Sequence, residues 1–313
     1  MRKRPLGKTG LFVSEMSLGT WGLSGDGYGH VDEGVAEAVI ARCIEMGMNL
    51  VETADAYGGG KMEALLGRVL ANKDVFVVTK GGTDRTTDPP RKRFEGDYLR
   101  ERVQSSLKRL KRDRLDVYLL HNPSIVALGS TNAVETMQAL VKEGLIAHWG
   151  VSASSDEVAR LAIEKGAEVI ELAYNLFQGA DLHRIAGDIM VAGTGVLARS
   201  VLSHGLLSGY WPKDREFPEG DHRSQRWTKL ELEQRVNQLD AVRFLVRGDV
   251  YTMRAAAVRF VMANSLVSSA VLGPRSVEQA EQLVRETGGG PRYLSDEQLS
   301  QLPRSLQKMG ILT

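Results

Sequence analysis

Eight short apolar segments recur along the whole chain, and each is followed by a longer segment of helical character. Most of the apolar segments are continuous rather than alternating, which is typical of strands that are buried on both faces. Strands that alternate with helices predict a parallel sheet covered by helices. The apolar segments lie at residues 15–20, 49–53, 75–80, 115–121, 147–152, 169–174, 195–200 and 268–273.

The segments between the predicted strands have apolar residues at helical spacing and capping signals at their ends. In "DYLRERVQSSLKRLKR", Leu99, Val103, Leu107 and Leu110 recur on one helical face. Ser155 before "DEVARLAIEK" is a predicted N-cap. We expect helices at 31–46, 61–70, 96–110, 132–143, 155–165, 183–191, 253–264 and 277–286, and an extra C-terminal helix at 295–308.

Eight strand-helix units predict an α/β fold of the (β/α)8 type, a TIM barrel formed by residues 1–313 as a single domain. Residues 4–14, "RPLGKTGLFVS", predict an N-terminal β-hairpin with "GKTG" as its turn. Residues 201–235 are polar in the middle and contain Gly and Pro, so we expect a long loop after the seventh strand. An open doubly wound sheet is the competing fold, but "SGDGYG" (24–29) does not match its GxGxxG motif.

The charge and cysteine content restrict the partners and the compartment. With 40 basic and 39 acidic residues the formal net charge is +1, so no bulk attraction to nucleic acid or membrane is expected. Cys43 is the single cysteine, which excludes an intrachain disulfide and fits a reducing compartment. No stretch approaches the ~18 apolar residues of a membrane span, and no signal-peptide core follows the basic start. We expect a cytoplasmic monomer or small homo-oligomer whose partner is a small molecule.

Four residue types that can form a proton-transfer unit lie at the ends of strands two, three and four or in the loop after strand two. They are a carboxylate (Glu52 or Asp55), the phenol of Tyr57, the ammonium of Lys80 and the imidazole of His121. The active site of a (β/α)8 barrel lies at these strand ends. A nearby ammonium lowers the phenol's ordinary pKa of ~10, a carboxylate holds the ammonium, and an imidazole orients a carbonyl oxygen. The set predicts protonation of that oxygen as a hydride reaches the carbon.

Each of these residues also has a structural interpretation. Tyr57 could pack, Lys80 could extend to solvent, and the acids could cap a helix. Their convergence on three neighbouring strand ends favours the catalytic interpretation, but it does not decide between Glu52 and Asp55.

A second pattern predicts a phosphate site. In "LGPRSVEQAEQL" a Gly-Pro-Arg-Ser turn directly precedes a helix, whose N-terminus favours an anion. Arg275 and Ser276 add a charge and a donor, although Ser276 could serve only as an N-cap. A 2′-phosphate on an adenosine ribose would suit Arg275, which favours NADP over NAD.

Several motifs in order resemble the aldo-keto reductases, in particular the bacterial branches and the potassium-channel β subunits. They include "PLGKTGLFVSEMSLGTWGL" (5–23), "ETADAYGGGKMEALLGRVL" (52–70), "VVTKGG" (77–82), "LDVYLLHNP" (115–123), "LVKEGLIAHWGVSA" (140–153), "LAYNLF" (172–177), "LSHGLLSG" (202–209) and "VLGPRSVEQAEQL" (271–283). The resemblance implies a (β/α)8 barrel that binds NADPH without a Rossmann motif and reduces aldehydes and ketones. It implies that Tyr57 is the proton donor, with Lys80 as its partner and His121 as the orienting residue, and it places Glu52 at the position of the family's aspartate.

The resemblance also implies the ligand contacts. Trp21, Tyr28 and His121 are expected to line the substrate pocket, and no metal is expected. The expected cofactor-binding residues are Gly19, Thr20, Trp21, Ser152, Glu171, Arg199, Ser200, Leu202, Gly205, Gly273, Arg275, Ser276 and Gln279. Ser152-Ala153 stands where the family has Ser-Asn, Glu171 where it has glutamine, Arg199 where it has a stacking aromatic residue, and Leu283 where it has asparagine.

These departures motivate a second hypothesis, an NADP(H)-binding regulatory or sensor subunit with weak or no turnover. A third hypothesis is a lyase or isomerase that uses Lys80 as a Schiff-base nucleophile.

Overall fold

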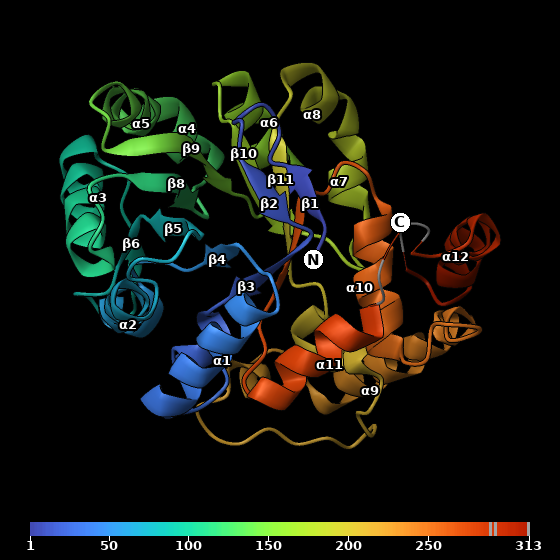
Figure 1. Cartoon of the computed structure of the whole chain (residues 1–313). Coiled ribbons are helices and arrows are strands. Elements are labelled where there is room, and N and C mark those ends of the chain that lie inside the picture. Colours follow the sequence, from blue (N-terminus) through green and yellow to red (C-terminus); the bar gives the residue numbers. More distant parts are fainter. Residues whose placement is uncertain (288–289, 291–292, 312–313) are drawn as a thin grey trace.

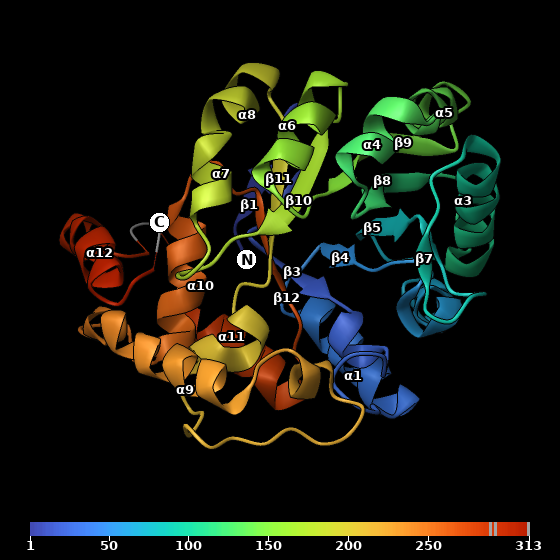
Figure 2. The same ribbon diagram turned by 180° about the vertical axis from the view of Figure 1, so that it is seen from behind.

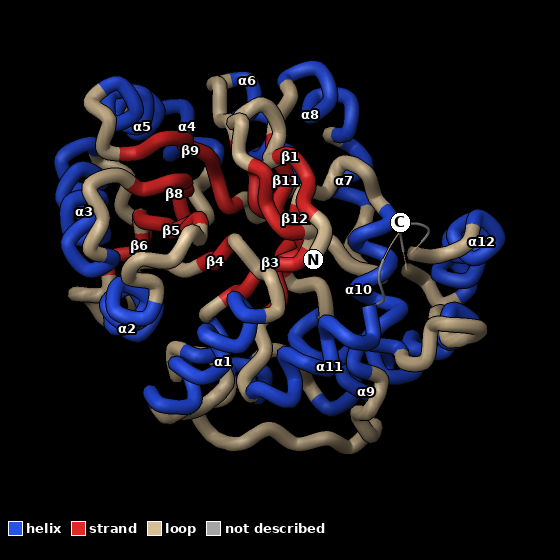
Figure 3. Tube along the Cα trace, in the orientation of Figure 1, coloured by secondary structure: helices blue, strands red, loops and turns tan. Residues whose placement is uncertain are grey.

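Eight parallel strands form a closed barrel in the computed structural model, which describes residues 1–287, 290 and 293–311. Their order around the barrel is β10-β11-β12-β3-β4-β5-β8-β9. Figure 3 shows the strands gathered in the middle with helices outside them. The strands are β3 (Met16–Gly19), β4 (Leu50–Glu52), β5 (Phe76–Gly81), β8 (Leu115–His121), β9 (Ile146–Ser152), β10 (Val169–Ala173), β11 (Gly195–Arg199) and β12 (Ser269–Leu272). The predicted (β/α)8 barrel is confirmed.

Helices surround the barrel on all sides, as the two opposite views in Figures 1 and 2 show. They are α1 (Glu33–Glu45), α2 (Lys61–Val69), α3 (Gly96–Leu110), α4 (Ile125–Ser130), α5 (Ala133–Lys142), α6 (Asp156–Glu164), α7 (Ala180–Arg184), α8 (Ala186–Ala192), α9 (Lys229–Gln238), α10 (Met253–Ala263), α11 (Val277–Thr287) and α12 (Asp296–Lys308). The predicted N-cap of α6 is confirmed, because the Ser155 side chain accepts a hydrogen bond from Val158 N. The extra C-terminal helix is also present, as α12.

Strand residues alternate between two apolar layers. One layer fills the barrel interior and includes Leu50, Val78, Leu119, Val169 and Leu197. The neighbouring residues in sequence point outward and pack against the helices in a larger cluster. Because side chains alternate along a strand, the residue two positions after each interior residue also faces the barrel axis.

The N-terminal hairpin closes the amino-terminal end of the barrel. β1 (Lys3–Pro5) pairs antiparallel with β2 (Phe12–Ser14), as predicted from "GKTG". Gly7 and Gly10 have positive φ values of 54° and 79° in the turn between them. Leu6 and Val13 are fully buried and belong to the same apolar cluster as the interior strand residues. The hairpin therefore forms the floor beneath the interior layer.

The structure corrects two predicted elements. The helix predicted at 183–191 is two helices, α7 and α8, because Ile185 leaves helical geometry at φ −106° and ψ 10° and its side chain is buried. The loop predicted at 201–235 ends earlier, because α9 begins at Lys229. Thr228 and Glu231 form a capping box there, with Thr228 N donating to Glu231 Oε2 at 2.8 Å.

Two further features lie in segments for which the sequence predicted no element. They are α4 and a small hairpin of β6 (Thr83–Asp84) and β7 (Arg91–Lys92) that follows β5. Across the described ranges, no helix combines the length and the apolar character that crossing a membrane requires.

Candidate active site

The predicted catalytic residues form one layer at the carboxyl ends of the strands. Glu52 lies two residues after Leu50, Lys80 two after Val78, and His121 two after Leu119. Each therefore extends the interior face of its strand by one step. Glu171 on β10 and Arg199 on β11 follow the same spacing from interior residues. The barrel thus brings together side chains from five strands.

Lys80 lies between two carboxylates. Its Nζ forms an ion pair with Glu52 Oε1, and Glu171 Oε2 lies 3.2 Å from the same nitrogen. The three side chains are almost completely buried, with exposed fractions of 1%, 5% and 2% for Lys80, Glu52 and Glu171. Burial lowers the pKa of Lys80, and the charge of Glu171 opposes that change.

Tyr57 joins this charged group from the turn that follows β4. Its hydroxyl donates to Glu52 Oε1 at 3.4 Å, and Lys80 Nζ lies 5.3 Å from the centre of its ring. The sequence led us to expect that the ammonium of Lys80 lowers the pKa of Tyr57. In the structure the net change is in the opposite direction. Burial and the charge of Glu171 raise that pKa far above its usual range, and Arg199 opposes them. The phenol therefore keeps its proton.

His121 lies beside Tyr57 as a neutral imidazole. The two rings meet edge to face, with centres 6.1 Å apart. Burial, Lys80, Lys92 and Arg199 all lower the pKa of His121 well below its usual range. Lys92 belongs to the β6–β7 hairpin and donates to the backbone oxygen of His121 at 2.8 Å. A neutral imidazole can offer one N–H as a donor to a carbonyl oxygen.

Asp55 lies outside this layer. It is the nearest titratable group in sequence to Tyr57, yet its charge interacts with Glu63 on α2 and with Arg109 on α3, in the space between barrel and helices. Tyr118, whose pKa Asp55 raises, belongs to the outward-facing cluster. Burial raises the pKa of Asp55 to about 7. The structure therefore selects Glu52 as the carboxylate that contacts Tyr57 and Lys80.

Several predicted cofactor residues have structural partners of their own. Thr20 is fully buried, and its Oγ1 and N both donate to Glu52 O at 3.0 Å. Thr20 therefore fixes the end of β4 rather than presenting its hydroxyl to a ligand. Gly19 lies directly beside the site, because a Cβ there would come within 3.1 Å of Glu52 Oε2. Ser152 is buried and pairs in register with His121 and Glu171.

The segment after β11 contains the next group of predicted residues. Ser200, Ser203 and His204 have φ values of 57°, 46° and 59°, and Gly205 has φ 96°. Ser203 N donates to Ser200 O at 2.8 Å and Gly205 N donates to Leu202 O at 2.9 Å, so these N–H groups close the turn. Arg199 donates to Ala153 O at 3.0 Å, and Leu202 lies at the start of the 3-10 turn Ser203–Ser208.

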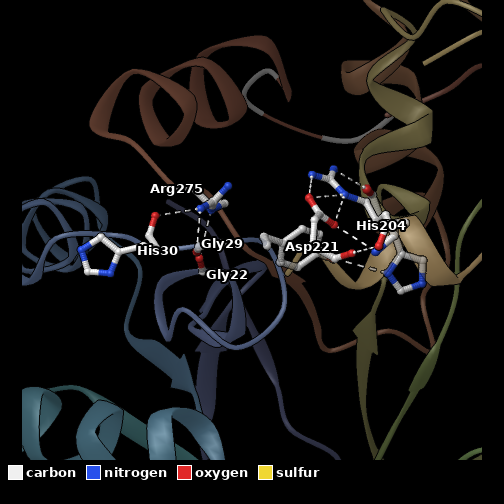
Figure 4. A network of polar contacts seen from close by, with 9 residues as sticks. Gly22, Gly29, His30, His204, Asp221 and Arg275 are labelled. Atoms are coloured by element: carbon white, nitrogen blue, oxygen red, sulfur yellow. Dashed lines mark hydrogen bonds and ion pairs between the residues drawn. The ribbon is translucent and has the colours of Figure 1, made fainter. Parts of the chain in front are cut away.

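The predicted phosphate site is partly occupied by the protein itself. Arg275 Nε donates to Gly22 O at 3.1 Å, and Nη2 donates to Gly29 O and His30 O. Figure 4 shows this side chain directed at the loop that carries Gly29 and His30. Within the described part of the chain, Nη1 makes no hydrogen bond that would prevent it from facing a phosphate.

The rest of the turn shows what Ser276 and Gln279 do. Ser276 Oγ accepts from Gln279 N, so Ser276 does cap α11, and Gln279 Oε1 accepts from Arg275 N. Gly273 is exposed at the start of the turn. These contacts order the turn before α11 and use two of its backbone N–H groups, those of Arg275 and Gln279.

Two loops meet over the carboxyl end of the barrel, and we call residues 22–30 and 200–228 the mouth loops. Tyr28 and Asp221 form an antiparallel bridge, and His222 N donates to Gly27 O at 2.8 Å. Tyr28 OH lies 3.3 Å from His204 Nδ1, and Figure 4 shows His204 and Asp221 in this group. Arg223 pairs with Asp221 and lies 4.8 Å from the Tyr28 ring centre.

Trp21 completes an aromatic cluster at this junction. Its ring centre lies 5.1 Å from that of Tyr28 and 4.8 Å from that of His222. Of these residues, only Trp21 and Tyr28 were predicted to line the site. The partners from the second loop were missed because a polar loop has no periodicity that reveals where it folds.

Comparison with known proteins identifies the family. The family model described as the Aldo/keto reductase family matches residues 15–303. The match covers most of the chain, and the closed barrel and the catalytic layer agree with it. The chain belongs to the aldo/keto reductase family.

Three curated relatives cover most of their own length and of this chain. The uncharacterized oxidoreductase YqkF of Bacillus subtilis (strain 168) is 26% identical over 96% of this chain and 95% of its own. The aldo-keto reductase YhdN of the same organism is 28% identical over 92% and 89%. A probable voltage-gated potassium channel subunit beta of Oryza sativa subsp. japonica is 26% identical over 89% of each.

Two solved structures share the fold. The glycerol dehydrogenase AKR11B4 from Gluconobacter oxydans has a TM-score of 0.85 at 26% identity, with 99% of this chain and 97% of that chain covered. The holo form of the aldo-keto reductase AKR11C1 from Bacillus halodurans has a TM-score of 0.82 at 24% identity, with coverage of 97% and 96%.

Proposed function

We propose that the protein is an NADPH-dependent reductase of aldehydes or ketones in which Tyr57 is the general acid. The observation that carries the proposal is the buried contact of Tyr57 with the Glu52–Lys80 ion pair, beside the neutral imidazole of His121. A phenol that holds its proton until the oxygen of the substrate becomes basic suits the role of an acid.

Each residue of the layer has a distinct task in this proposal. The carbonyl oxygen lies between the Tyr57 hydroxyl and His121, and Tyr57 gives it a proton. Lys80 stabilises the phenolate that remains, and Glu52 holds Lys80 in place. Tyr28, from the first mouth loop, and Trp21, directly before it, shape the pocket. Bound NADPH supplies the hydride that reaches the carbonyl carbon.

The mouth fits a polar, anionic cofactor. One buried atom of this layer, His121 Nδ1, has no hydrogen-bond partner among the described residues. The N-terminus of α11 favours phosphate groups. Arg275 Nη1 would favour a 2′-phosphate, so we expect NADPH to bind more tightly than NADH. Titration of tryptophan fluorescence with each cofactor measures this preference.

A regulatory subunit is the second candidate, favoured by the likeness to a probable channel subunit beta. This second hypothesis predicts that the protein binds NADPH and does not turn over any carbonyl compound. A Schiff base at Lys80 receives no support, because Nζ pairs with two carboxylates and is 1% exposed.

The decisive experiment compares Tyr57→Phe with the wild type. We expect NADPH oxidation in the presence of an aldehyde panel to fall by about 10²- to 10⁴-fold, because the proton donor is lost. Tyr251→Phe is a matched control, since Tyr251 is 76% exposed and far from the barrel interior. Equal rates in Tyr57→Phe and wild type would refute the role of Tyr57, and binding without turnover in both would favour the regulatory subunit.

A further inference from the structure

The hairpin of β6 and β7 brings one lysine, Lys92, to the site, and the proposed reaction does not use it. Lys92 pairs in register with Thr83, and its Nζ donates to Thr83 Oγ1 at 2.7 Å and to His121 O at 2.8 Å. His121 is the last residue of β8, so the ammonium lies at the carboxyl end of the barrel. It is therefore next to the residue whose imidazole would orient a substrate carbonyl.

The hairpin holds this lysine in a defined position. Asp84 is 3% exposed and accepts hydrogen bonds from N and Oγ1 of Thr86 at 2.9 and 2.6 Å. It also pairs with Arg91 and Arg93, each at 3.4 Å. The buried carboxylate of the hairpin is thus engaged with two arginines and not with Lys92.

The ammonium of Lys92 has no carboxylate within ion-pair distance among the described residues, since both oxygens that it contacts are neutral. Partial burial lowers the pKa of Lys92 to about 8, and the charge of Asp55 opposes that change. The side chain is therefore largely protonated at neutral pH. An ammonium has three N–H donors, and two are used here. One donor and a positive charge remain for a ligand.

The position of Lys92 separates it from the predicted phosphate site. That site precedes α11, which follows β12, whereas Lys92 contacts the end of β8. β8 and β12 lie four places apart among the eight strands of the closed barrel, so they face each other across the axis. Figure 2 likewise shows β7 and α11 on different sides of the barrel. An anion bound by Lys92 thus belongs to the substrate rather than to the phosphate groups near Arg275.

We propose that Lys92 is a substrate-binding residue, which selects carbonyl compounds that carry a carboxylate. Its ammonium binds the carboxylate at the rim of the barrel, while His121 orients the carbonyl oxygen. One remaining donor and one positive charge match a carboxylate, which has a single negative charge. The inference rests on the proposed function for the carbonyl group, and it adds the class of substrate.

The test compares pairs of aldehydes in which a methyl group replaces the carboxylate. Succinic semialdehyde is paired with butanal, and para-carboxybenzaldehyde with para-tolualdehyde. Calorimetric titration of the protein, with and without NADP+, gives the dissociation constant of each compound, and NADPH oxidation gives kcat/KM. We expect at least one acid to bind about tenfold more tightly than its neutral partner, because a charge-assisted hydrogen bond at a partly exposed site contributes about that factor.

Four variants isolate the charge of Lys92. Lys92→Met should abolish the preference for the acid, and Lys92→Arg, which keeps the charge, should retain most of it. Lys92→Gln keeps N–H donors without the charge, so it should behave like Lys92→Met and replaces that variant if it does not fold. Lys73→Met is the matched control and should leave the preference unchanged, because Lys73 is exposed in the connection that precedes β5, at the amino end of the barrel.

The outcomes separate this inference from the proposed function. A preference for the acids that is lost in Lys92→Met and Lys92→Gln supports the inference, even if no aldehyde is reduced and the proposed function fails. Equal or undetectable binding of acid and neutral compound by the wild type overturns it, even if turnover depends on Tyr57. Weaker binding of both members of a pair in Lys92→Met, with the preference unchanged, also overturns it and would show that Lys92 only supports the end of β8.

Discussion

A spacing of two residues along each strand decides which side chains face the barrel axis. Glu52 faces the barrel axis and contacts Lys80, whereas Asp55, three residues later, lies between the barrel and α2 and α3. Asp55 nevertheless fixes the backbone at the site, because its N donates to Lys80 O at 2.9 Å. The two acids of "VETADAYGGG" therefore lie in separate environments, Glu52 beside Lys80 inside the barrel and Asp55 between the barrel and the helices.

Asp55→Asn should stabilise the protein more at pH 8 than at pH 5. The pKa of Asp55 is raised to about 7 in the folded protein, above its ordinary value of 3.8, chiefly by burial. Protonated Asp55 contributes its full share of the free energy of unfolding below about pH 4. That contribution is lost as the pH rises to about 7. We expect a gain on the order of 3 kcal/mol at pH 8. Denaturant unfolding at both pH values measures it, and equal gains at pH 5 and 8 would contradict the buried charge.

The mouth loops are the elements with the least regular structure around the site. Their junction depends on a few contacts, namely the Tyr28–Asp221 bridge, the hydrogen bond from His222 N to Gly27 O, and the Tyr28–His204 contact. His204 adopts a left-handed conformation with φ 59°, which is unfavourable for a residue with a Cβ. Arg275 holds the first loop from the opposite side through three backbone oxygens.

Mild acid should loosen this junction before it unfolds the barrel. Burial, Arg226, His222, Arg199 and Arg223 lower the pKa of His204 to about 3. Burial, Arg226 and Arg223 also lower the pKa of His222, and Asp221 opposes them. Because the folded-state pKa of His204 lies below the ordinary 6.5, this stability is full above about pH 6.5 and is lost as the pH falls toward 3. Hydrogen exchange of residues 22–30 and 200–228 at about pH 4.5, corrected for the intrinsic rate, should exceed that at pH 7.

His204→Asn is the matched variant for this prediction. Asparagine tolerates the left-handed conformation and does not titrate in this range. The variant should lose most of the acid-induced exchange, and an unchanged response would show that His204 is not the group involved.

At the scale of the whole molecule, the predicted catalytic residues and the contacts that stabilise the N-terminal hairpin lie at opposite ends of the barrel. The predicted catalytic residues lie at the carboxyl ends of the strands, and the N-terminal hairpin closes the other end. Arg4 ties that hairpin to the body of the protein. It pairs with Glu15 at 2.6 Å and donates to Met262 O, Asn264 O and Val267 O.

Arg4→Ala should therefore lower stability without changing the site. The loss leaves the buried Glu15 carboxylate without its closest cation, which costs roughly 3 kcal/mol. Thermal unfolding measures the loss, and the NADPH dissociation constant should stay within about twofold of the wild type. Arg243→Ala is the control, since Arg243 and its partner Asp240 are both exposed and such pairs contribute about 0–1 kcal/mol. A weakened NADPH affinity in Arg4→Ala would show that the two ends are coupled.

Much of this molecule could be predicted from local patterns. The eight strands, the hairpin turn and most helices were predicted because buried parallel strands and amphipathic helices have characteristic periodicity. Tyr57, Lys80 and His121 were predicted because they follow strands in the chain. The break at Ile185, the start of α9 and the β6–β7 hairpin were missed, since each depends on local geometry that short polar or mixed segments do not encode in a period.

The sequence by itself determined the barrel and the residue types at its mouth, because burial patterns and strand ends are local properties of the chain. Only the tertiary structure decided how those residues pair. It placed Glu52 rather than Asp55 on Lys80, brought Glu171 from the opposite side of the barrel to the same ammonium, and directed Arg275 at backbone oxygens. These contacts join residues far apart in the chain, and barrel closure sets which of them meet.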